Sequence, residues 1–457
     1  MSQLTSELVA DSAEARALSR LLESPAELNA ATLGSDRAAW LESIQQAARD
    51  RLHNSAFPTT RDEEWRFTPL KSLLEPTFQE ADIAKVDIEA GKGAIASYML
   101  PEAKATRLVF VNGTFSPDLS DVADAPEGLA IGSLGTLSDE QWQVARSHFT
   151  LDVMGQADTF ALLNSARTRD IAIVHASKNC MAETPIHLIW LSTTADEPTA
   201  SYPRCLVVAD RGSSLRLVEQ SIGTEDATYF ANAVTEVVLA ENARIEHCKL
   251  QEDAAASFSI SRTTVSQARD SHYSCVAIST GAKLSRHSLS TEHRGTNATT
   301  ILNGLTLLGD KQIADTHTAI DHAQPQGTSR QLHKCIVGDR ARAVFNGRVI
   351  VRQDAQQIDS SQSSRNLLLS SKARVDTKPQ LEIFADDVKC AHGATVSQLE
   401  EDELFYLQSR GLTRVKAEQL LTFAFAADII DRVSIPSLAT RLKQFVLEQS
   451  AIASRSE

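Results

Sequence analysis

The sequence predicts a mainly β protein built around a parallel β-helix, with helical regions before and after it. Three observations predict this class. Helical periodicity is lost from about residue 170 to about residue 397, and short runs of alternating apolar and polar residues replace it. Such alternation is typical of strands. A degenerate repeat of a turn residue, a small residue and a strand recurs at spacings between 29 and 40 residues, which indicates a solenoid.

The region before these strands, residues 1–168, is expected to form a helical N-terminal domain with a few short strands. A first helix is predicted over residues 11–23. A second is predicted after Ser35, which is the expected N-cap. The apolar residues of each predicted helix recur at helical spacing and should form its buried face; they are Leu18, Leu21 and Leu22 in the first, and Trp40, Ile44, Ala47 and Ala48 in the second.

A short aromatic segment, DEEWRFTPL, follows at residues 62–70. Pro69 makes it a poor helix interior, because proline lacks a backbone N–H and clashes with the preceding turn. We therefore predict an extended stretch that docks Trp65 and Phe67 on the core.

Residues 169–397 are expected to form the β-helix core. In such a fold each coil stacks on the next, so every strand finds backbone partners on both sides. A jelly-roll sandwich is the main alternative, but one jelly roll uses fewer strands than this region offers. The alternating runs include DIAIVHAS, IHLIWLST, CLVVAD, SLRLVEQ, TEVVLAE, RIEHCKL, YSCVAIS, KLSRHSL, RVIVRQD and QLEIFAD.

The last region, residues 398–457, is predicted to form a helical C-terminal domain. One helix should end at Gly411 and the next should begin after Thr413, an N-cap residue type. Ser434 and Pro436 signal the start of a third helix, in which Leu438, Leu442, Phe445 and Val446 follow helical spacing. An open solenoid end exposes strand edges and apolar side chains, so these helices are expected to cap that end.

Composition excludes several functional classes. The net charge of −14 argues against a nucleic-acid binder, which needs basic grooves to neutralise phosphates. No apolar run approaches the roughly 20 residues of a membrane helix. The N-terminus lacks the pattern of a secretory signal. The six cysteines are scattered, which fits reduced thiols. We predict a cytoplasmic protein; an organellar form after removal of a transit peptide remains an alternative.

Most catalytic signatures are missing from the sequence. It has no P-loop, no nucleophile elbow, no H-E-x-x-H and no EF-hand loop. Histidines are frequent in one part of the predicted core, where two readings compete. They form a metal or proton-transfer cluster, or they are ordinary residues of solvent-facing strands, which we favour. These histidines are His287, His293, His317, His322 and His333.

Cys390 and His392 stand two residues apart. On a strand, residues i and i+2 share a face, so both side chains can bind one soft metal ion or cluster if other ligands join them. A single C-x-H supplies only two ligands. The residues alone therefore leave two readings open: half of a metal site, or a buried cysteine beside a hydrogen-bonded histidine.

The segment KPQLEIFADDVKCAHGATVSQLEEDELFYLQSRGL, residues 378–412, closely resembles the C-terminal signature of the SufB/SufD family of iron–sulfur cluster assembly proteins. RNLLLSSKARVDTKPQLEI, residues 365–383, extends the match, and DEEWRFTPL resembles the family's N-terminal motif. The resemblance implies a right-handed parallel β-helix between two helical domains. It also implies a non-enzymatic scaffold subunit in a complex of one SufB, one SufD and two copies of the ABC-type ATPase SufC.

The resemblance also assigns residues. The C-terminal helices would engage SufC, and the residues expected there are Leu404, Phe405, Leu407, Phe423 and Phe425. His392 would lie at the interface with SufB, with Cys390 beside it. An essential cysteine of SufB corresponds to Ser364 here, which favours the SufD type. No cofactor is then expected to bind stably to the chain alone, and iron or a nascent cluster would be held transiently in the complex. Isolated chains are expected to form homodimers by strand pairing.

Two alternatives remain at this point. One is a cytosolic carbohydrate-active β-helix enzyme, which would use carboxylates such as Asp315, Asp321 and Asp359 in an outer groove. The other is a SufD-type subunit in which Cys390 and His392 only stabilise the dimer.

Overall fold

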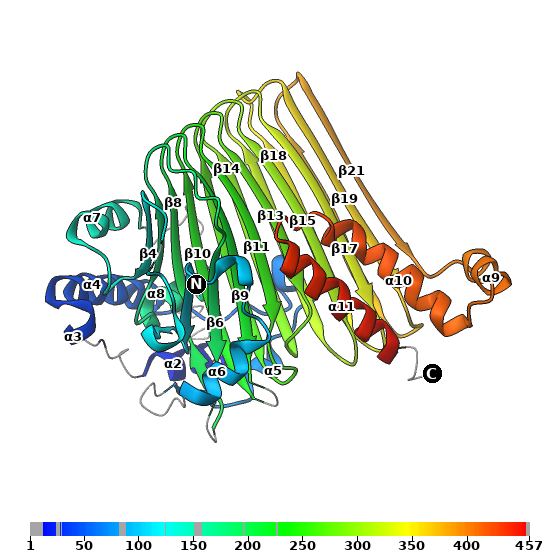
Figure 1. Ribbon diagram of the computed structural model, residues 1–457, viewed down its shortest axis with the longest axis horizontal. Coiled ribbons are helices and arrows are strands. Elements are labelled where there is room, and N and C mark those ends of the chain that lie inside the picture. The colour runs from blue at the N-terminus through cyan, green and yellow to red at the C-terminus, as the bar shows by residue number, and fades with distance from the viewer. Residues whose placement is uncertain are drawn as a thin grey trace, which may run out of the picture.

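The protein is described by a computed structural model, which covers residues 12–23, 28, 30–81, 88–123, 125–149, 158–194, 197–224 and 227–453. Two mostly parallel β-sheets face each other and form a flattened solenoid (Figure 1). Helices from the N-terminal part lie at one end of it, and helices from the C-terminal part lie along one side. Across the described ranges, no helix is long and apolar enough to cross a membrane.

From residue 229 onward, consecutive strands alternate between the two sheets, and each pairs in parallel with the strand two places earlier. The two sheets together make about seven turns between residues 172 and 397 and confirm the predicted β-solenoid. Sheet A contains β4 (Leu129–Ser133), β5 (Ala172–Ala176), β8 (Arg204–Ala209), β10 (Tyr229–Leu239), β12 (Phe258–Gln267), β14 (Leu284–His293), β16 (Ile313–His322), β18 (Arg342–Val351) and β20 (Arg374–Ile383), with β1 (Gln79–Glu80) and β7 (Thr199–Ser201) joined beside β10. Sheet B contains β2 (Arg107–Val111), β3 (Thr114–Phe115), β6 (Ile186–Ser192), β9 (Ser214–Gly223), β11 (Arg244–Glu252), β13 (His272–Ser279), β15 (Thr299–Leu308), β17 (Thr328–Val337), β19 (Ile358–Leu368) and β21 (Val388–Ser397).

A residue with a left-handed backbone recurs at most turns from a strand of sheet A to the next strand of sheet B. The backbone N–H of one such residue donates to the turn of the next coil, as from Asn242 to Arg269 O and from Asp270 to Thr296 O, both at 3.0 Å. Asn and Asp tolerate this conformation better than most residues, which explains the punctuation of the sequence. These residues are Asn242, Asp270, Asn297, Gln326 and Gln357, with φ between 56° and 63°.

The N-terminal helices confirm the two predicted helices but change their details. The helix α4 begins at Ser35, and Gly34, with φ of 82°, is its N-cap. Its fully buried face is rotated by one to two positions from the predicted one. Gln45 belongs to that face because its Nε2 donates to the Thr168 carbonyl at 2.8 Å. The helices are α2 (Ala13–Leu22), α3 (Ala30–Leu33), α4 (Ser35–Leu52), α5 (Lys71–Leu74), α6 (Ile88–Ala96), α7 (Asp139–His148) and α8 (Thr159–Arg167), and the buried residues of α4 are Ala38, Leu41, Gln45, Ala48 and Leu52.

The segment DEEWRFTPL is not extended as predicted. Residues Glu63–Trp65 form a 3-10 turn, which the Trp65 N–H closes on the Asp62 carbonyl at 2.9 Å. Pro69 does not prevent this turn because it comes after it. Trp65 is buried and stacks on Phe160, with 5.2 Å between the ring centroids, and Phe67 is half-buried.

The C-terminal region forms α9 (Glu401–Ser409), α10 (Arg414–Ile430) and α11 (Pro436–Ala453). Gly411 follows α9 with a left-handed backbone, and the Thr413 hydroxyl caps α10 by accepting from Lys416 N, as predicted. The predicted start at Ser434 is shifted. The first carbonyl to accept a helical bond in α11 is that of Ile435, which bonds Ala439 N at 3.0 Å.

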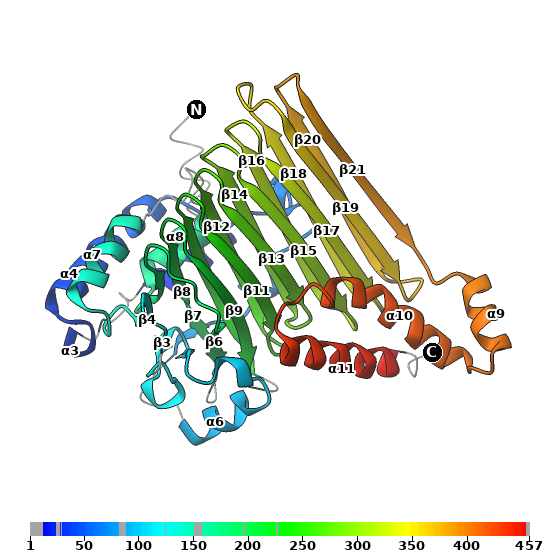
Figure 2. The same ribbon diagram turned by 45° about the horizontal axis from the view of Figure 1, so that its top comes forward.

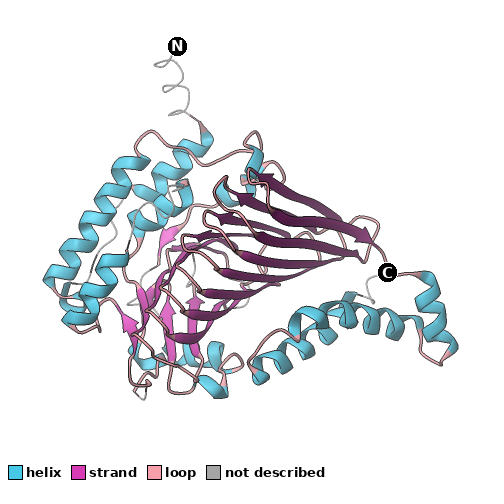
Figure 3. Cartoon of the chain, turned by 90° about the horizontal axis from the view of Figure 1, so that it is seen from above, coloured by secondary structure: helices cyan, strands magenta, loops and turns pink. Residues whose placement is uncertain are grey.

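These helices do not cap the end of the solenoid. Figures 1 and 2 show α10 and α11 lying across the outer face of sheet B, while these helices leave β21 uncovered and α9 projects beyond it. Figure 3 shows the helices as a separate layer beside the strands. The physical reason is the apolar outer face of sheet B, which needs a cover more than the small and polar outer face of β21 does. Its contacts with α10 and α11 come from Val218, Leu250, Val276, Ile278, Leu305, Leu307, Ile336 and Leu367.

Candidate functional site at the open end of the solenoid

Cys390 and His392 lie on β21, the last strand of sheet B. Cys390 pairs in register with Ser360 of β19, and His392 pairs with Gln362. Cys390 packs with Val388 against buried core residues of the last coils, so this face of β21 looks inward. His392, two residues further on, is on the same face.

The end of the solenoid is open at this strand. Within the described chain, β21 pairs only with β19 and β20 pairs only with β18, so each strand keeps one free edge. His392 is exposed although it belongs to the inward row. Large apolar side chains at this end of the solenoid also lie open to solvent: Phe384, which follows β20, is 63% exposed, and Val396 of β21 is 49% exposed. Backbone donors, backbone acceptors and the apolar interior are thus all available here.

Cys390 differs from the other cysteines. It is half-buried, whereas the remaining five are buried, and all six are free thiols. Partial burial raises the pKa of the Cys390 thiol, and a hydrogen bond from the Ser360 backbone opposes that effect. The thiol therefore keeps its proton at neutral pH, and a soft metal ion or a positive charge from a partner would have to displace it.

Ser364 lies on β19 and is buried beneath the open end. Its hydroxyl accepts hydrogen bonds from Asn366 Nδ2 and Thr377 Oγ1, both at 3.1 Å. Its register neighbour on β21 is Ala394, next to His392 in the inward row. The structure thus places Ser364, Cys390 and His392 on one inward face of two adjacent strands.

Polar side chains continue this face into the solenoid. Gln362 Nε2 donates to Gln331 Oε1 at 2.7 Å, and Gln331 Nε2 donates to Thr318 Oγ1 at 2.8 Å. Gly347 leaves room for them, since a Cβ there would lie 2.1 Å from Gln362 Nε2. Gln362 Oε1 is buried and accepts no hydrogen bond from the described residues.

Four of the five core histidines face inward, not toward solvent as expected, whereas His317 lies on the outer face of sheet A, with its Nδ1 2.8 Å from Glu64 Oε2. His287, His293, His322 and His333 are buried, and each approaches a hydroxyl of the interior through Nε2. Burial lowers the pKa of His322 and of His333 to about 4, so these imidazoles are neutral. No group of three metal-binding side chains occurs among the residues that the structure describes.

The carboxylates considered for a carbohydrate-active enzyme do not form one site. Asp315 and Asp321 lie on β16 of sheet A, whereas Asp359 lies on β19 of sheet B. Each is paired with an arginine, and Asp315 is fully buried by Arg286 and His317. The paired-carboxylate geometry of a glycosidase is therefore not present at these positions.

The residues expected to contact SufC differ in accessibility. Leu404 is 1% exposed, Phe405 on the same helix is 73% exposed, and Leu407 is half-buried. Phe423 and Phe425 pack partly against the cluster that joins α10 to sheet B. The Lys334 ammonium lies 4.5 Å from the Phe425 ring centroid and pairs with Asp428 at 2.9 Å.

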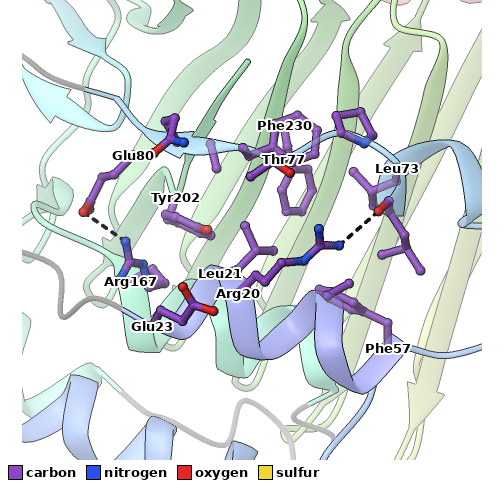
Figure 4. Close-up of a pocket in the computed structure, with 16 residues that line it drawn as sticks. Arg20, Leu21, Glu23, Phe57, Leu73, Thr77, Glu80, Arg167, Tyr202 and Phe230 are labelled. Atoms are coloured by element: carbon purple, nitrogen blue, oxygen red, sulfur yellow. Dashed lines mark hydrogen bonds and ion pairs between the residues drawn. The ribbon is translucent and has the colours of Figure 1, made fainter. Parts of the chain in front are cut away.

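Sequence reasoning missed a cavity of about 280 Å³ between α2 and the first strands of the core (Figure 4). Leu21, Phe57 and Phe230 give it apolar walls, and Arg167, paired with Glu80 at 3.0 Å, closes one side. Its lining comes from segments between residues 17 and 230, so no local pattern could have revealed it.

Comparisons with known families decide what this architecture belongs to. Residues 191–425 match the SufBD core domain of SUF system FeS cluster assembly, and residues 27–188 match the SufBD protein N-terminal region. The chain belongs to the SufBD family. These two matches confirm the predicted family. The match to the core domain also covers the alternating strands that precede Cys390 and His392.

Within the SufBD family, three curated relatives span most of this chain. A SufBD family iron–sulfur cluster assembly protein of Synechocystis is 40% identical over 410 residues, 88% of this chain and 89% of the relative. The chloroplast protein ABCI7 of Arabidopsis thaliana is 34% identical over 399 residues, 86% and 82% of the two chains. The SufD protein of Escherichia coli is 33% identical over 384 residues, 83% and 86%. The chain is thus a SufD-like member of the SufBD family.

Proposed function

We propose that the chain is a non-enzymatic scaffold subunit of a SUF iron–sulfur cluster assembly complex. It pairs with a SufB-type subunit at the open end of the solenoid and binds the ATPase SufC through its C-terminal helices. We assign three domains to this subunit. Residues 1–168 form the N-terminal helical domain, residues 169–397 form the β-solenoid core, and residues 398–457 form the helical domain that docks the ATPase. The proposed site of action is the cytoplasm or, as the name of the chloroplast relative suggests, an organelle.

The observation that carries this proposal is the free end formed by β20 and β21. Exposed strand edges recruit further strands, because unpaired N–H and C=O groups find partners there. Exposed apolar residues beside the edges, Ile383, Phe384 and Val396, add surface that gains by burial. The same features support homodimers of the isolated chain when no SufB-type subunit is present.

His392 is the proposed ligand of this subunit for iron or a nascent cluster, with Cys390 as a second. Imidazole and thiolate both suit iron. Because Ser364 offers a hydroxyl where SufB has its cysteine, the chain by itself lacks the main thiolate. The cluster is cargo of the complex, and the partner completes the ligand set.

The helix α9 supports the proposed contact with SufC. Phe405 and Tyr406 are exposed on it, and no described element covers them. Leu404 faces inward, so a docking ATPase would contact Phe405 instead. Since α10 follows α9 directly and packs on sheet B, motion of the ATPase would reach the solenoid through it.

The first test replaces His392 by Ala in a reconstituted complex of this chain with SufB and SufC. We expect the complex to assemble while cluster formation, followed by its visible absorbance, falls by about tenfold or more, as for loss of a metal ligand or its immediate support. His53→Ala is the matched control, because His53 is also exposed but follows α4. Unchanged cluster formation in an intact His392→Ala complex would leave the histidine with a purely structural role.

The second test separates the two proposed interfaces. Phe405→Asp should weaken SufC binding by about 2 kcal/mol or more, as for an aromatic hot spot, and leave pairing with the SufB-type subunit intact. Phe384→Asp should do the reverse. Both side chains are exposed in the free chain, so neither change should alter its thermal unfolding. Surface plasmon resonance against each partner measures both affinities, and a loss of both in one variant contradicts the assignment.

A further inference from the structure

The segment Glu63–Phe67 crosses the outer face of sheet A close to its free end. It belongs to the motif DEEWRFTPL, which the proposed function does not use. We call it the strap. Its contacts reach four successive strands of the sheet, β14, β16, β18 and β20. These strands lie more than 200 residues further along the chain than the strap.

The strap is anchored on β14 and β16. The Arg286 guanidinium lies 3.9 Å from the Trp65 ring centroid, and its Nη1 donates to the Glu64 carbonyl at 2.8 Å. The same guanidinium pairs with Asp315, which also accepts from Thr68 Oγ1 at 2.5 Å. A buried ion pair with hydrogen bonds of this kind holds a defined geometry.

His317 joins the strap to this anchor. Its Nε2 lies 2.9 Å from Asp315 Oδ1, and its Nδ1 lies 2.8 Å from Glu64 Oε2. Burial opposes the charged imidazole, but the carboxylates of Asp315 and Glu64 outweigh burial and raise its pKa. Two carboxylates beside one histidine favour the doubly protonated ring through charge attraction.

The strap then reaches β20, the terminal strand of sheet A. The Glu63 carboxylate pairs with Lys378 Nζ. The Arg342 guanidinium of β18 lies 5.1 Å from the Phe67 ring centroid, and its Nε donates to Asp376 at 2.7 Å. Asp376 and Lys378 are the two outward residues in the middle of β20, on either side of Thr377.

Thr377 connects β20 to the candidate site. It alternates with Asp376 and Lys378 and therefore points to the other face of the sheet, into the solenoid. There its hydroxyl donates to Ser364 Oγ, in the inward row beside Gln362 and His392. One short stretch of β20 thus carries the strap on its outside and the Thr377–Ser364 bond on its inside.

We propose that the strap positions β20 for subunit pairing. The free edge of β20 and the Thr377–Ser364 hydrogen bond then already have their final geometry before the partner subunit binds. A terminal strand is hydrogen-bonded along one edge only, and such strands open more easily than interior ones. The strap supplies side-chain contacts on the outer face of β20 and leaves its free edge open. This role rests on the proposed function, because it assumes that the open end is the pairing surface.

The test exchanges the charges of the ion pair between the strap and β20. Glu63→Lys and Lys378→Glu should each speed hydrogen exchange of the β20 amides in the isolated chain by roughly three- to tenfold, the scale of one exposed ion pair turned into a repulsion. Amides of β16 should be unaffected. The double variant should restore protection. Glu89→Lys is the matched control, because Glu89 has an exposed ion pair with Lys92 on α6.

Partner affinity gives the second measurement. Each single variant should bind the SufB-type subunit several-fold more weakly, and the double variant should bind it like the wild type. Unchanged β20 exchange in the single variants, or no recovery in the double variant, overturns the proposal. If β20 loosens as expected but the wild-type chain does not bind the SufB-type subunit, the hold of the strap on β20 is supported and the proposed pairing is what fails.

Discussion

Replacing Glu219 by Ala is expected to destabilise the chain by about 3–5 kcal/mol, because a buried ammonium would lose its counter-charge. Glu219 Oε1 lies 2.6 Å from Lys249 Nζ, and both side chains are buried inside the solenoid. The carboxylate also accepts from Trp190 Nε1 at 3.1 Å and from Thr235 Oγ1 at 3.0 Å. The substitution would therefore orphan three donors in the interior.

Urea denaturation followed by circular dichroism measures this effect. Glu246→Ala is the matched control: Glu246 is exposed on β11, and its loss should change the free energy of unfolding by less than about 0.5 kcal/mol. Adding Lys249→Met to Glu219→Ala should recover part of the stability, since it removes the unpaired charge. A loss below about 1 kcal/mol in Glu219→Ala would mean that water reaches Lys249 and that the interior is not dry.

The pH dependence of this contribution has a defined sign. Burial raises the pKa of Glu219, but Lys249 and His247 outweigh burial and lower it well below its ordinary value of 4.5. A lowered carboxyl pKa contributes stability that is complete above the unfolded pKa and is lost as pH falls toward the folded one. The difference in stability between the wild type and Glu219→Ala should therefore be constant near neutral pH and shrink only in acid.

Leu438→Ala should cost about 2–5 kcal/mol, the usual range for a fully buried leucine that leaves a cavity. Leu438 is 0% exposed in the cluster that joins α10 and α11 to sheet B. Leu447→Ala is the control on the same helix, because Leu447 is 41% exposed. Thermal unfolding compares the two, and faster hydrogen exchange confined to α10 and α11 in Leu438→Ala would locate the damage. Equal stability of the two variants would show that contacts other than those of Leu438 keep α11 packed on sheet B.

The prediction of strands succeeded because inward and outward positions alternate along each of them. The position of the C-terminal helices could not be predicted as easily. It depends on Leu305 and Leu307, which both point outward from β15. An apolar pair on the outer face favours a helix packed over it. That signal was present in the run ILNGLTLL, but it is visible only when the face of each residue is known. The open end likewise becomes visible only when the inward and outward residues of β21 are known.

The site and the strap were predictable to different degrees. Spacing placed Cys390 and His392 on one face of a strand, and the structure places them so, but their exposure depends on what fails to cover β21. The strap depends on pairs such as Glu63 with Lys378, which are 315 residues apart. No local periodicity encodes such contacts. The 3-10 turn that presents Trp65 is closed by backbone bonds from Trp65 N to Asp62 O and from Arg66 N to Glu63 O.

The direction of α10 and α11 across the coils has a mechanical consequence. Their apolar contacts run from Val218 on β9 to Leu367 on β19, so they bind many coils at once. The hydrogen bonds between coils point along the same direction, so they stiffen the solenoid along its axis. A force applied to α9 is then distributed over many coils. It should rotate the whole solenoid instead of separating one coil from the next. The compliant element is the edge of β20 and β21, where no further coil resists.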